Sequence, residues 1–217
     1  MKQTTSLLLF LLALLCSCED AMDDYRYPSV VTDYACLVTD AAGEPSKLRL
    51  DNGCAYPIVY ADEYMEAHPQ LPSYKADTAY RVVSIYELGS DSVARIYSLS
   101  RTVSDTPTPL RTGEQLHQDP AYLQSIWLSG GYLNMVIEIK ALDGKHSIGF
   151  VDTTPEGMKG KEFTFYHKVI DDVESYRQRL YGSIPLQPFD RELQVGDTLR
   201  FVIRTYDEGM KRSEFYF

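Results

Sequence analysis

Short runs in which apolar and polar residues alternate, separated by turn residues, recur from about position 30 to the end of the chain. In the clearest run, Leu133, Met135, Ile137 and Ile139 alternate with mostly polar neighbours. A repeat of two places every second side chain on one face of a β-strand, so each run predicts a strand with one buried face. Because such runs occupy both halves of the chain, the sequence predicts an all-β protein.

The first half contains five predicted strands, at residues 33–39, 47–50, 54–60, 78–88 and 93–99. Asn52-Gly53 separates the second from the third, and it is the strongest hairpin signal in the chain because both residues tolerate a positive φ. Residues 61–77 contain Pro69 and Pro72 and are predicted to form a loop or one short helical turn. Five short strands in about 75 residues predict a small OB-like β-barrel over residues 30–104.

The second half begins after a stretch rich in proline and polar residues, 105–120, which is predicted to be a linker between two domains. The segment 171–181 is ambiguous, since Asp171 and Asp172 can cap a helix while the residues after them alternate, and a strand is favoured. The other strands are predicted at residues 123–129, 132–141, 146–152, 162–167, 198–205 and 212–217. About seven strands in about 100 residues predict an antiparallel β-sandwich over residues 121–217.

The N-terminus has the features of an export signal. Lys2 precedes an apolar run at residues 7–15, which is too short to cross a bilayer. The run ends Leu15-Cys16-Ser17-Cys18, which resembles a lipoprotein signal with Cys18 as the acylated residue. Residues 1–17 are therefore predicted to be removed, and Cys18 to anchor the protein in a membrane through its lipid. The alternative is an ordinary secretory signal with cysteines in its tail.

Residues 18–29 are predicted to be an acidic tether, with Glu19, Asp20, Asp23 and Asp24 close behind Cys18. This stretch resembles the surface-export signal of Bacteroidetes lipoproteins, which implies an outer-membrane lipoprotein displayed on the cell surface. The alternative is a solvated tether at the periplasmic face of the outer membrane, because acidic segments without apolar residues do not pack.

The acidic composition restricts the classes of molecule that the protein can bind. The formal net charge is −10, and it becomes −11 when Lys2 leaves with the signal. Nucleic acid is excluded as a partner because binding phosphates requires clustered Lys and Arg. A basic protein partner remains compatible with this charge.

Two cysteines remain in the mature chain besides Cys18, namely Cys36 and Cys54. In an oxidising compartment they can form a disulfide that closes a small loop. The alternative is two small buried apolar side chains. Neither cysteine is beside a histidine in the sequence, which does not favour a nucleophilic thiol.

No motif for catalysis, a cofactor or a metal is evident. The four histidines, His68, His117, His146 and His167, do not form a zinc pattern. A calcium site at Asp143 or Asp171-Asp172 lacks the ligand spacing of an EF-hand loop. Paired carboxylates of a glycosidase depend on positions in space, so the sequence leaves that alternative open. The prediction is a protein that is not an enzyme.

A ten-residue stretch in the second half resembles a signature of the NigD-like lipoproteins of Bacteroidetes. It comprises residues 125–134, Ser-Ile-Trp-Leu-Ser-Gly-Gly-Tyr-Leu-Asn, and His167, residues 171–176 and residues 196–198 agree with it. In the first half only Leu50-Asp51-Asn52-Gly53 matches. The resemblance implies a lipoprotein with an OB-like domain followed by a β-sandwich, in a family named for bacteriocin immunity.

Within that stretch Gly130-Gly131 predicts a turn or bulge with positive φ. Trp127 and Tyr132 are interpreted either as structural residues or as a ligand platform. Together these features predict a surface lipoprotein that binds a protein such as a toxin. The alternative function is a glycan-binding accessory lipoprotein.

Overall fold

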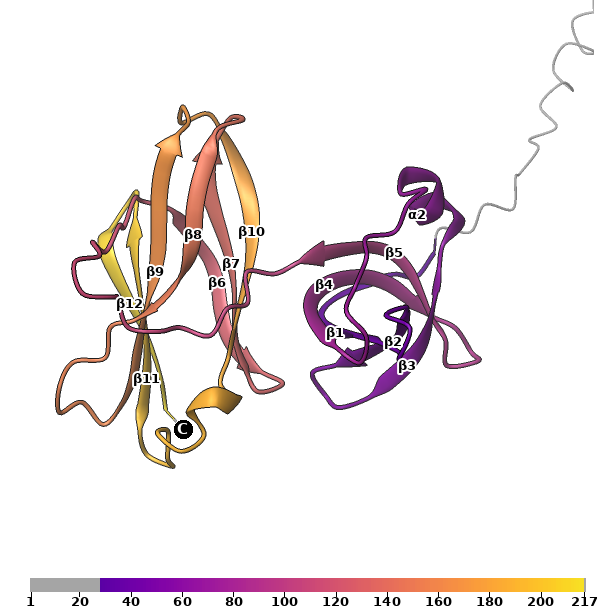
Figure 1. The fold of residues 1–217 in the computed structure, drawn as a ribbon, viewed down its shortest axis with the longest axis horizontal. Coiled ribbons are helices and arrows are strands. Elements are labelled where there is room, and N and C mark those ends of the chain that lie inside the picture. The colour runs from indigo at the N-terminus through magenta and orange to yellow at the C-terminus, as the bar shows by residue number, and fades with distance from the viewer. Residues whose placement is uncertain (1–27, 217) are drawn as a thin grey trace, which may run out of the picture.

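The computed structural model describes residues 28–216 and contains two β domains joined by one extended segment (Figure 1). The predicted signal peptide 1–17, Cys18 and most of the predicted tether 18–29 lie outside the described residues. Within residues 28–216, no helix is long and apolar enough to cross a membrane.

The first domain is a closed five-stranded barrel, as predicted. Its strands are β1 (Val31–Thr39), β2 (Pro45–Leu50), β3 (Ala55–Tyr60), β4 (Ala79–Leu88) and β5 (Ala94–Arg101). They follow the order β1-β2-β3-β5-β4, and β1 closes the barrel by pairing with β4 as well as with β2. The pairing of β3 with β5 is parallel. The interior contains the fully buried Leu37, Leu48 and Ile96.

The β2–β3 turn forms as the sequence predicts. Gly53 has a φ of 88°, and Asn52 Oδ1 accepts a hydrogen bond from the Cys54 backbone at 2.9 Å. In the proline-containing stretch that follows β3, the short helix α2 (Asp62–Ala67) packs through Tyr64.

The second domain is a sandwich of a three-stranded sheet, β10-β7-β6, and a four-stranded sheet, β12-β11-β9-β8. Phe163, Phe165, Phe201, Leu133 and Ile137 fill the space between the sheets. The sandwich is mostly antiparallel, as predicted, and includes one parallel pairing between β9 and β11. The bounds are β6 (Tyr122–Ser129), β7 (Tyr132–Ala141), β8 (Lys145–Asp152), β9 (Gly160–Asp171), β10 (Tyr176–Pro185), β11 (Thr198–Thr205) and β12 (Gly209–Tyr216), with a 3-10 turn at Gln187–Phe189.

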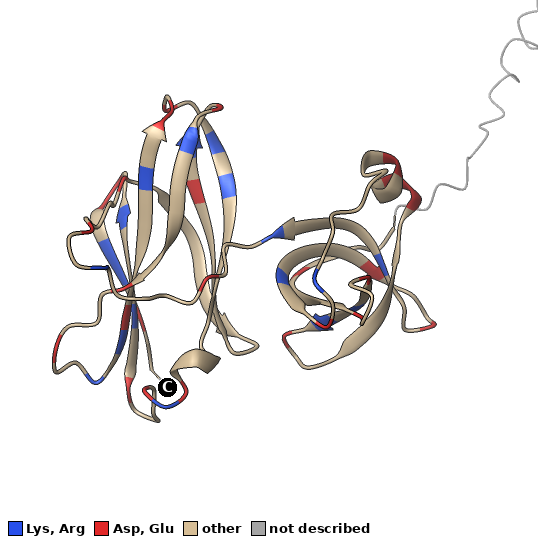
Figure 2. Cartoon of the chain, viewed as in Figure 1, with Lys and Arg blue, Asp and Glu red and all other residues tan. Residues whose placement is uncertain are grey.

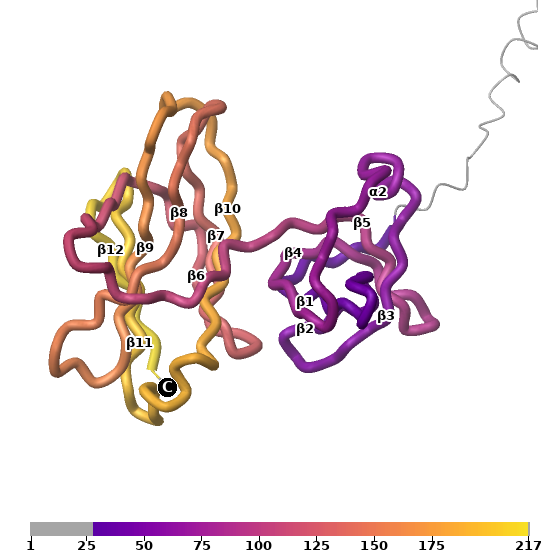
Figure 3. The backbone as a smooth tube through the Cα atoms, in the orientation of Figure 1, coloured from indigo at the N-terminus to yellow at the C-terminus, as the bar shows by residue number. Residues whose placement is uncertain are grey.

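The segment predicted to be a linker lies along the sandwich, as Figure 3 shows. Val103 bridges to Gly182 of β10, Thr108 to Val151 of β8 and Gln118 to His167 of β9. Pro107 is buried. These contacts make the segment a part of the sandwich domain.

Candidate functional site

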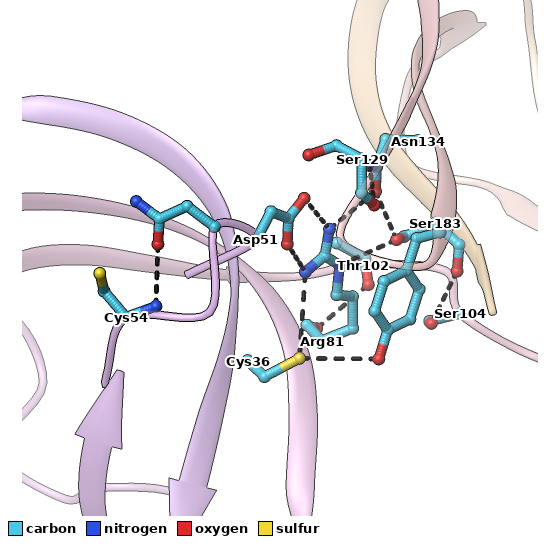
Figure 4. Close-up of polar contacts among 11 residues, drawn as sticks. Cys36, Asp51, Cys54, Arg81, Thr102, Ser104, Ser129, Asn134 and Ser183 are labelled. Carbon is cyan, nitrogen blue, oxygen red and sulfur yellow. Dashed lines mark hydrogen bonds and ion pairs between the residues drawn. The ribbon is translucent and has the colours of Figure 1, made fainter. Parts of the chain in front are cut away.

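The two domains meet at a buried arginine, Arg81, which is only 7% exposed. It extends from β4 of the barrel towards the sandwich, between the β2–β3 turn and the β6–β7 turn (Figure 4). A guanidinium ion in such a position needs partners for its donors, because burying a charge without them is costly.

Arg81 finds these partners on both domains. Its Nη1 and Nη2 donate to the two carboxylate oxygens of Asp51 at 2.5 and 2.8 Å. Nη2 also donates to Asn134 Oδ1, and Nε donates to Ser183 Oγ, both at 2.9 Å. Ser183 Oγ in turn donates to Asn134 Oδ1 at 2.7 Å. We call Asp51, Arg81, Asn134 and Ser183 the interdomain latch.

Within the latch, the positive charge of Arg81 is balanced by the negative charge of Asp51. Burial by itself would lower the pKa of Arg81, but the hydrogen bonds and charge of Asp51 outweigh this effect and the pKa is raised. The bidentate geometry fits a guanidinium group to a carboxylate and fixes their relative orientation. The barrel therefore presents a rigid charged pair to the two neutral acceptors of the sandwich.

Aromatic rings cover the latch. The Tyr132 ring lies 4.0 Å from the Arg81 guanidinium carbon, and its hydroxyl lies 3.6 Å from Cys36 Sγ. Tyr34 donates a hydrogen bond to the Met135 carbonyl at 2.6 Å. The Tyr34 ring meets Trp127 edge to face at 5.1 Å. Trp127 and Tyr132, the two residues predicted as a ligand platform, thus both lie at the domain junction.

The Gly130-Gly131 turn has the predicted conformation, with φ values of 59° and 81°. A Cβ atom on Gly130 would lie 2.5 Å from the Asp51 carboxyl carbon, whereas one on Gly131 would meet open space. Gly130 therefore has a second role that its turn position does not reveal, because it allows the two domains to approach.

An open cleft of about 510 Å³ flanks the junction. Its aromatic walls come from Tyr34, Trp127 and Tyr181, and Asp33, Asn52 and Arg179 supply polar groups. Burial, followed by the neighbouring Tyr181, raises the pKa of Tyr34, so its phenol remains a neutral donor at physiological pH. Tyr132 lines a second cleft of about 350 Å³ with Arg49 and Gln187, and the two clefts share Leu50 and Asp51 in their linings.

The disulfide considered for Cys36 and Cys54 is absent, and both are free thiols. Cys36 on β1 pairs with Arg49 on β2, which pairs with Ala55 on β3. Cys54, beside Ala55, is thus two strands away from Cys36, a separation of about 10 Å. A disulfide requires Cα atoms within about 7 Å, so this arrangement excludes the pair.

Two of the four histidines come together in a way that the sequence did not indicate. His146 Nδ1 lies 2.8 Å from His167 Nε2, and His146 Nε2 lies 2.7 Å from Asp172 Oδ2. In the barrel, His68 stacks on Tyr64, and on the connecting segment His117 meets Tyr166 edge to face. Within residues 28–216, no three His, Cys, Asp or Glu side chains are arranged to hold a metal ion, Asp143, Asp171 and Asp172 included.

Known proteins share this architecture. The sequence profile of the NigD-like C-terminal beta sandwich domain matches residues 102–217, more than half of the chain. The chain belongs to the NigD-like family. No curated protein sequence gives a match.

Solved structures share the fold. A NigD-like immunity protein from Bacteroides caccae is 28% identical, with a TM-score of 0.69 over 88% of this chain and 99% of that one. A candidate toxin-related protein from Parabacteroides distasonis is 17% identical, with a TM-score of 0.62 over 87% and 93%. A candidate lipoprotein from Bacteroides fragilis is 10% identical, with a TM-score of 0.56 over 86% and 96%. At these last two identities the likeness concerns the fold alone.

The stretch that resembles the NigD-like signature is the sandwich side of the junction. Trp127 meets Tyr34, Gly130 packs on Asp51, and Asn134 binds Arg81. Asp51 belongs to Leu50-Asp51-Asn52-Gly53, the one matching stretch of the first half. The two stretches, far apart in the NigD-like sequence, meet at the interdomain latch, while Leu133 of the same signature is fully buried in the core.

Proposed function

We propose that this protein is a surface-exposed lipoprotein, anchored in the outer membrane through Cys18, that binds a protein partner in an immunity-type role and catalyses no reaction. The observation that carries the proposal is the cleft beside the interdomain latch. It combines aromatic side chains and an arginine in one concave surface.

The composition of the cleft suits protein recognition. The residues that dominate binding energy at protein interfaces are enriched in Trp, Tyr and Arg, and Trp127, Tyr34, Tyr181 and Arg179 line this cleft. Tyr34 is held before binding by its hydrogen bond to the Met135 carbonyl and by its ring contacts with Trp127 and Tyr181, which lowers the ordering cost of association. A preformed cleft of this kind favours a partner that inserts a loop or a terminus.

The family of the chain and its net charge both support the proposal that it binds a protein. The similar structure from Bacteroides caccae is described as a NigD-like immunity protein, and the net charge of −10 favours a basic partner. Acidic residues are visible on α2 of the barrel (Figure 2), where Asp62, Glu63 and Glu66 are all exposed.

Affinity capture tests the proposal. The chain from residue 19 to 217 would be immobilised and exposed to secreted and envelope proteins of the producing bacteria and their competitors at two salt concentrations. We expect one basic protein to be retained, and retained less at high salt.

Reversing the charge of one cleft residue tests whether the cleft is the binding surface. Arg179→Glu should abolish retention of that protein although it makes the surface more acidic, because it removes the guanidinium group of a side chain that is 59% exposed and lines the cleft. Arg212→Glu is the matched control, since Arg212 is exposed on β12 of the same domain and does not line the cleft. Equal retention by both variants would reject the cleft as the binding surface.

Anchoring has its own test. Cys18→Ala should abolish incorporation of labelled palmitate and shift the protein from the outer-membrane fraction to the soluble fraction. Digestion of intact cells by an added protease would establish surface exposure, whereas protection until the outer membrane is permeabilised would place the protein on the periplasmic face.

The same cleft carries a glycan-binding alternative. Aromatic rings beside the polar side chains of Asp33 and Asn52 also suit a sugar. If the immobilised chain depletes polysaccharide and retains no protein, and if Arg179→Glu abolishes that depletion, the glycan-binding function replaces the protein-binding one.

A further inference from the structure

Two histidines of the sandwich form a sealed contact near one tip of the domain. His146 of β8 and His167 of β9 meet edge to edge in nearly parallel planes, with ring centroids 5.1 Å apart and an interplanar angle of 11°. His167 is 1% exposed, Phe165 covers it at 5.8 Å between ring centroids, and the side chain of His146 is 7% exposed. The short contact between His146 Nδ1 and His167 Nε2 is therefore shielded from water.

The two outer ring nitrogens both face groups that only accept hydrogen bonds. His146 Nε2 lies 2.7 Å from Asp172 Oδ2, and His167 Nδ1 lies 3.0 Å from the Asp119 carbonyl oxygen. The hydrogen bond from His146 lowers the pKa of Asp172 to about 2, so Asp172 is a carboxylate at neutral pH. Both outer nitrogens must therefore carry a proton.

Counting protons then determines the charge of the pair. A neutral imidazole carries one N–H. If both rings were neutral, each would use its proton on the outer side, and two lone pairs would face each other across 2.8 Å. The inner contact is a hydrogen bond only when a third proton is present, which makes one ring an imidazolium.

The imidazolium is assigned to His146. Burial lowers the pKa of His167, and the charge of His146 lowers it further. His146 has the Asp172 carboxylate as its direct partner. The charged groups that face the pair are Asp172 on the β9–β10 loop and Asp119 on the connecting segment, whose carboxylate accepts the Val169 backbone N–H at 2.7 Å.

The charged pair is connected to the loops of the tip. The Asp172 carboxylate also accepts backbone N–H groups of Leu142 in the β7–β8 turn at 3.1 Å and of Val173 at 2.7 Å. Gly144 of the same turn packs so closely on the backbone of Asp171 that it has no room for a side chain. Asp172 thus ties two loops together and to His146.

We propose that the His146–His167 pair is a pH-sensitive switch that holds one extra proton, on His146, and that releasing this proton loosens the tip of the sandwich. Once His146 is neutral, the facing lone pairs repel, the two rings separate and Asp172 loses its cationic partner. The exposed apolar side chains at this tip are Leu142, Ile170, Val173 and Tyr176. Histidine is the side chain whose charge ordinarily changes between pH 5 and 8.

Nuclear magnetic resonance of ring nitrogens tests the proton count directly. In the chain from residue 19 to 217 at pH 5.5, we expect both nitrogens of His146 and only Nδ1 of His167 to be protonated. As the pH rises, His146 should lose one proton. In the same step, hydrogen exchange at the Leu142 and Val173 amides, corrected for its intrinsic pH dependence, should rise about tenfold.

Two variants separate the switch from a general effect of pH. His146→Gln should make the exchange of the two tip amides independent of pH. His68→Gln, which removes an exposed histidine of the barrel, should leave the transition unchanged. A single protonated nitrogen on His146 throughout pH 5–8, or tip amides that do not respond when His146 titrates, would overturn the proposal.

Discussion

Gly130 of the sandwich lies against Asp51 of the barrel with no space for a side chain between them. An added Cβ atom would lie 2.5 Å from the carboxyl carbon and 2.8 Å from the Cβ of Asp51. The contact therefore couples a turn of one domain to the ion pair of the other.

Neighbouring glycines allow this coupling to be measured. Gly131→Ala should cost only the strain of a positive φ, about 1–2 kcal/mol of unfolding free energy, because its Cβ meets open space. Gly130→Ala should cost more than Gly131→Ala, since it also displaces Asp51. Urea denaturation followed by the fluorescence of Trp127, the single tryptophan, measures both; equal costs would contradict the close approach.

The latch predicts a large loss of stability when its arginine is removed. Arg81→Met leaves the Asp51 carboxylate, whose side chain is 14% exposed, without its partner. The cost should be about 3–5 kcal/mol. Arg101→Met, at an exposed position of the same barrel, serves as the control and should cost less than 1 kcal/mol.

Adding Asp51→Asn to Arg81→Met removes the unpaired charge. The double variant should therefore be more stable than the additive expectation from the two single variants. Strict additivity in the same denaturation assay would mean that the two residues do not act as a pair.

Tyr34 offers a smaller, local change at the junction. Tyr34→Phe deletes the hydrogen bond to the Met135 carbonyl and keeps the ring contact with Trp127. The expected loss is about 1 kcal/mol, with the emission maximum of Trp127 unchanged. A shifted maximum would show that the hydroxyl also positions the ring.

The lowered pKa of Asp172 predicts how the stability of the protein changes in acid. Its folded-state pKa of about 2 lies below the ordinary 3.8, mainly through the hydrogen bond from His146. On the acid side, its stabilising contribution is therefore fully present at about pH 4 and is lost as the pH falls through 2. Asp172→Asn should flatten the dependence of the melting temperature on pH in this window, and Asp143→Asn, in the exposed turn, should retain it.

Much of the fold follows from local sequence. Alternation located the strands of both domains, because a strand with one buried face needs every second residue to be apolar. The ambiguous segment after Asp171-Asp172 becomes β10, but only from Tyr176. The parallel pairings β3–β5 and β9–β11 were not predictable, since they join strands that no short turn connects.

The candidate site could be predicted only in part. Trp127 and Tyr132 were recognised from one motif, and the structure places both at the junction. Arg81 was not recognised, because within β4 it has the appearance of an ordinary outward-facing strand residue. Its role depends on Asn134 and Ser183, which are 53 and 102 residues away in the sequence. No local pattern carries information over such separations.

The wide spacing of the latch residues also bears on how the two domains can be joined. Asp51 and Arg81 both lie in the barrel, whereas Asn134 and Ser183, the latter 102 residues after Arg81, lie in the sandwich. The ion pair can therefore form within a barrel that has closed on its own, and the sandwich is matched to this charged template once its strands have brought Asn134 and Ser183 together.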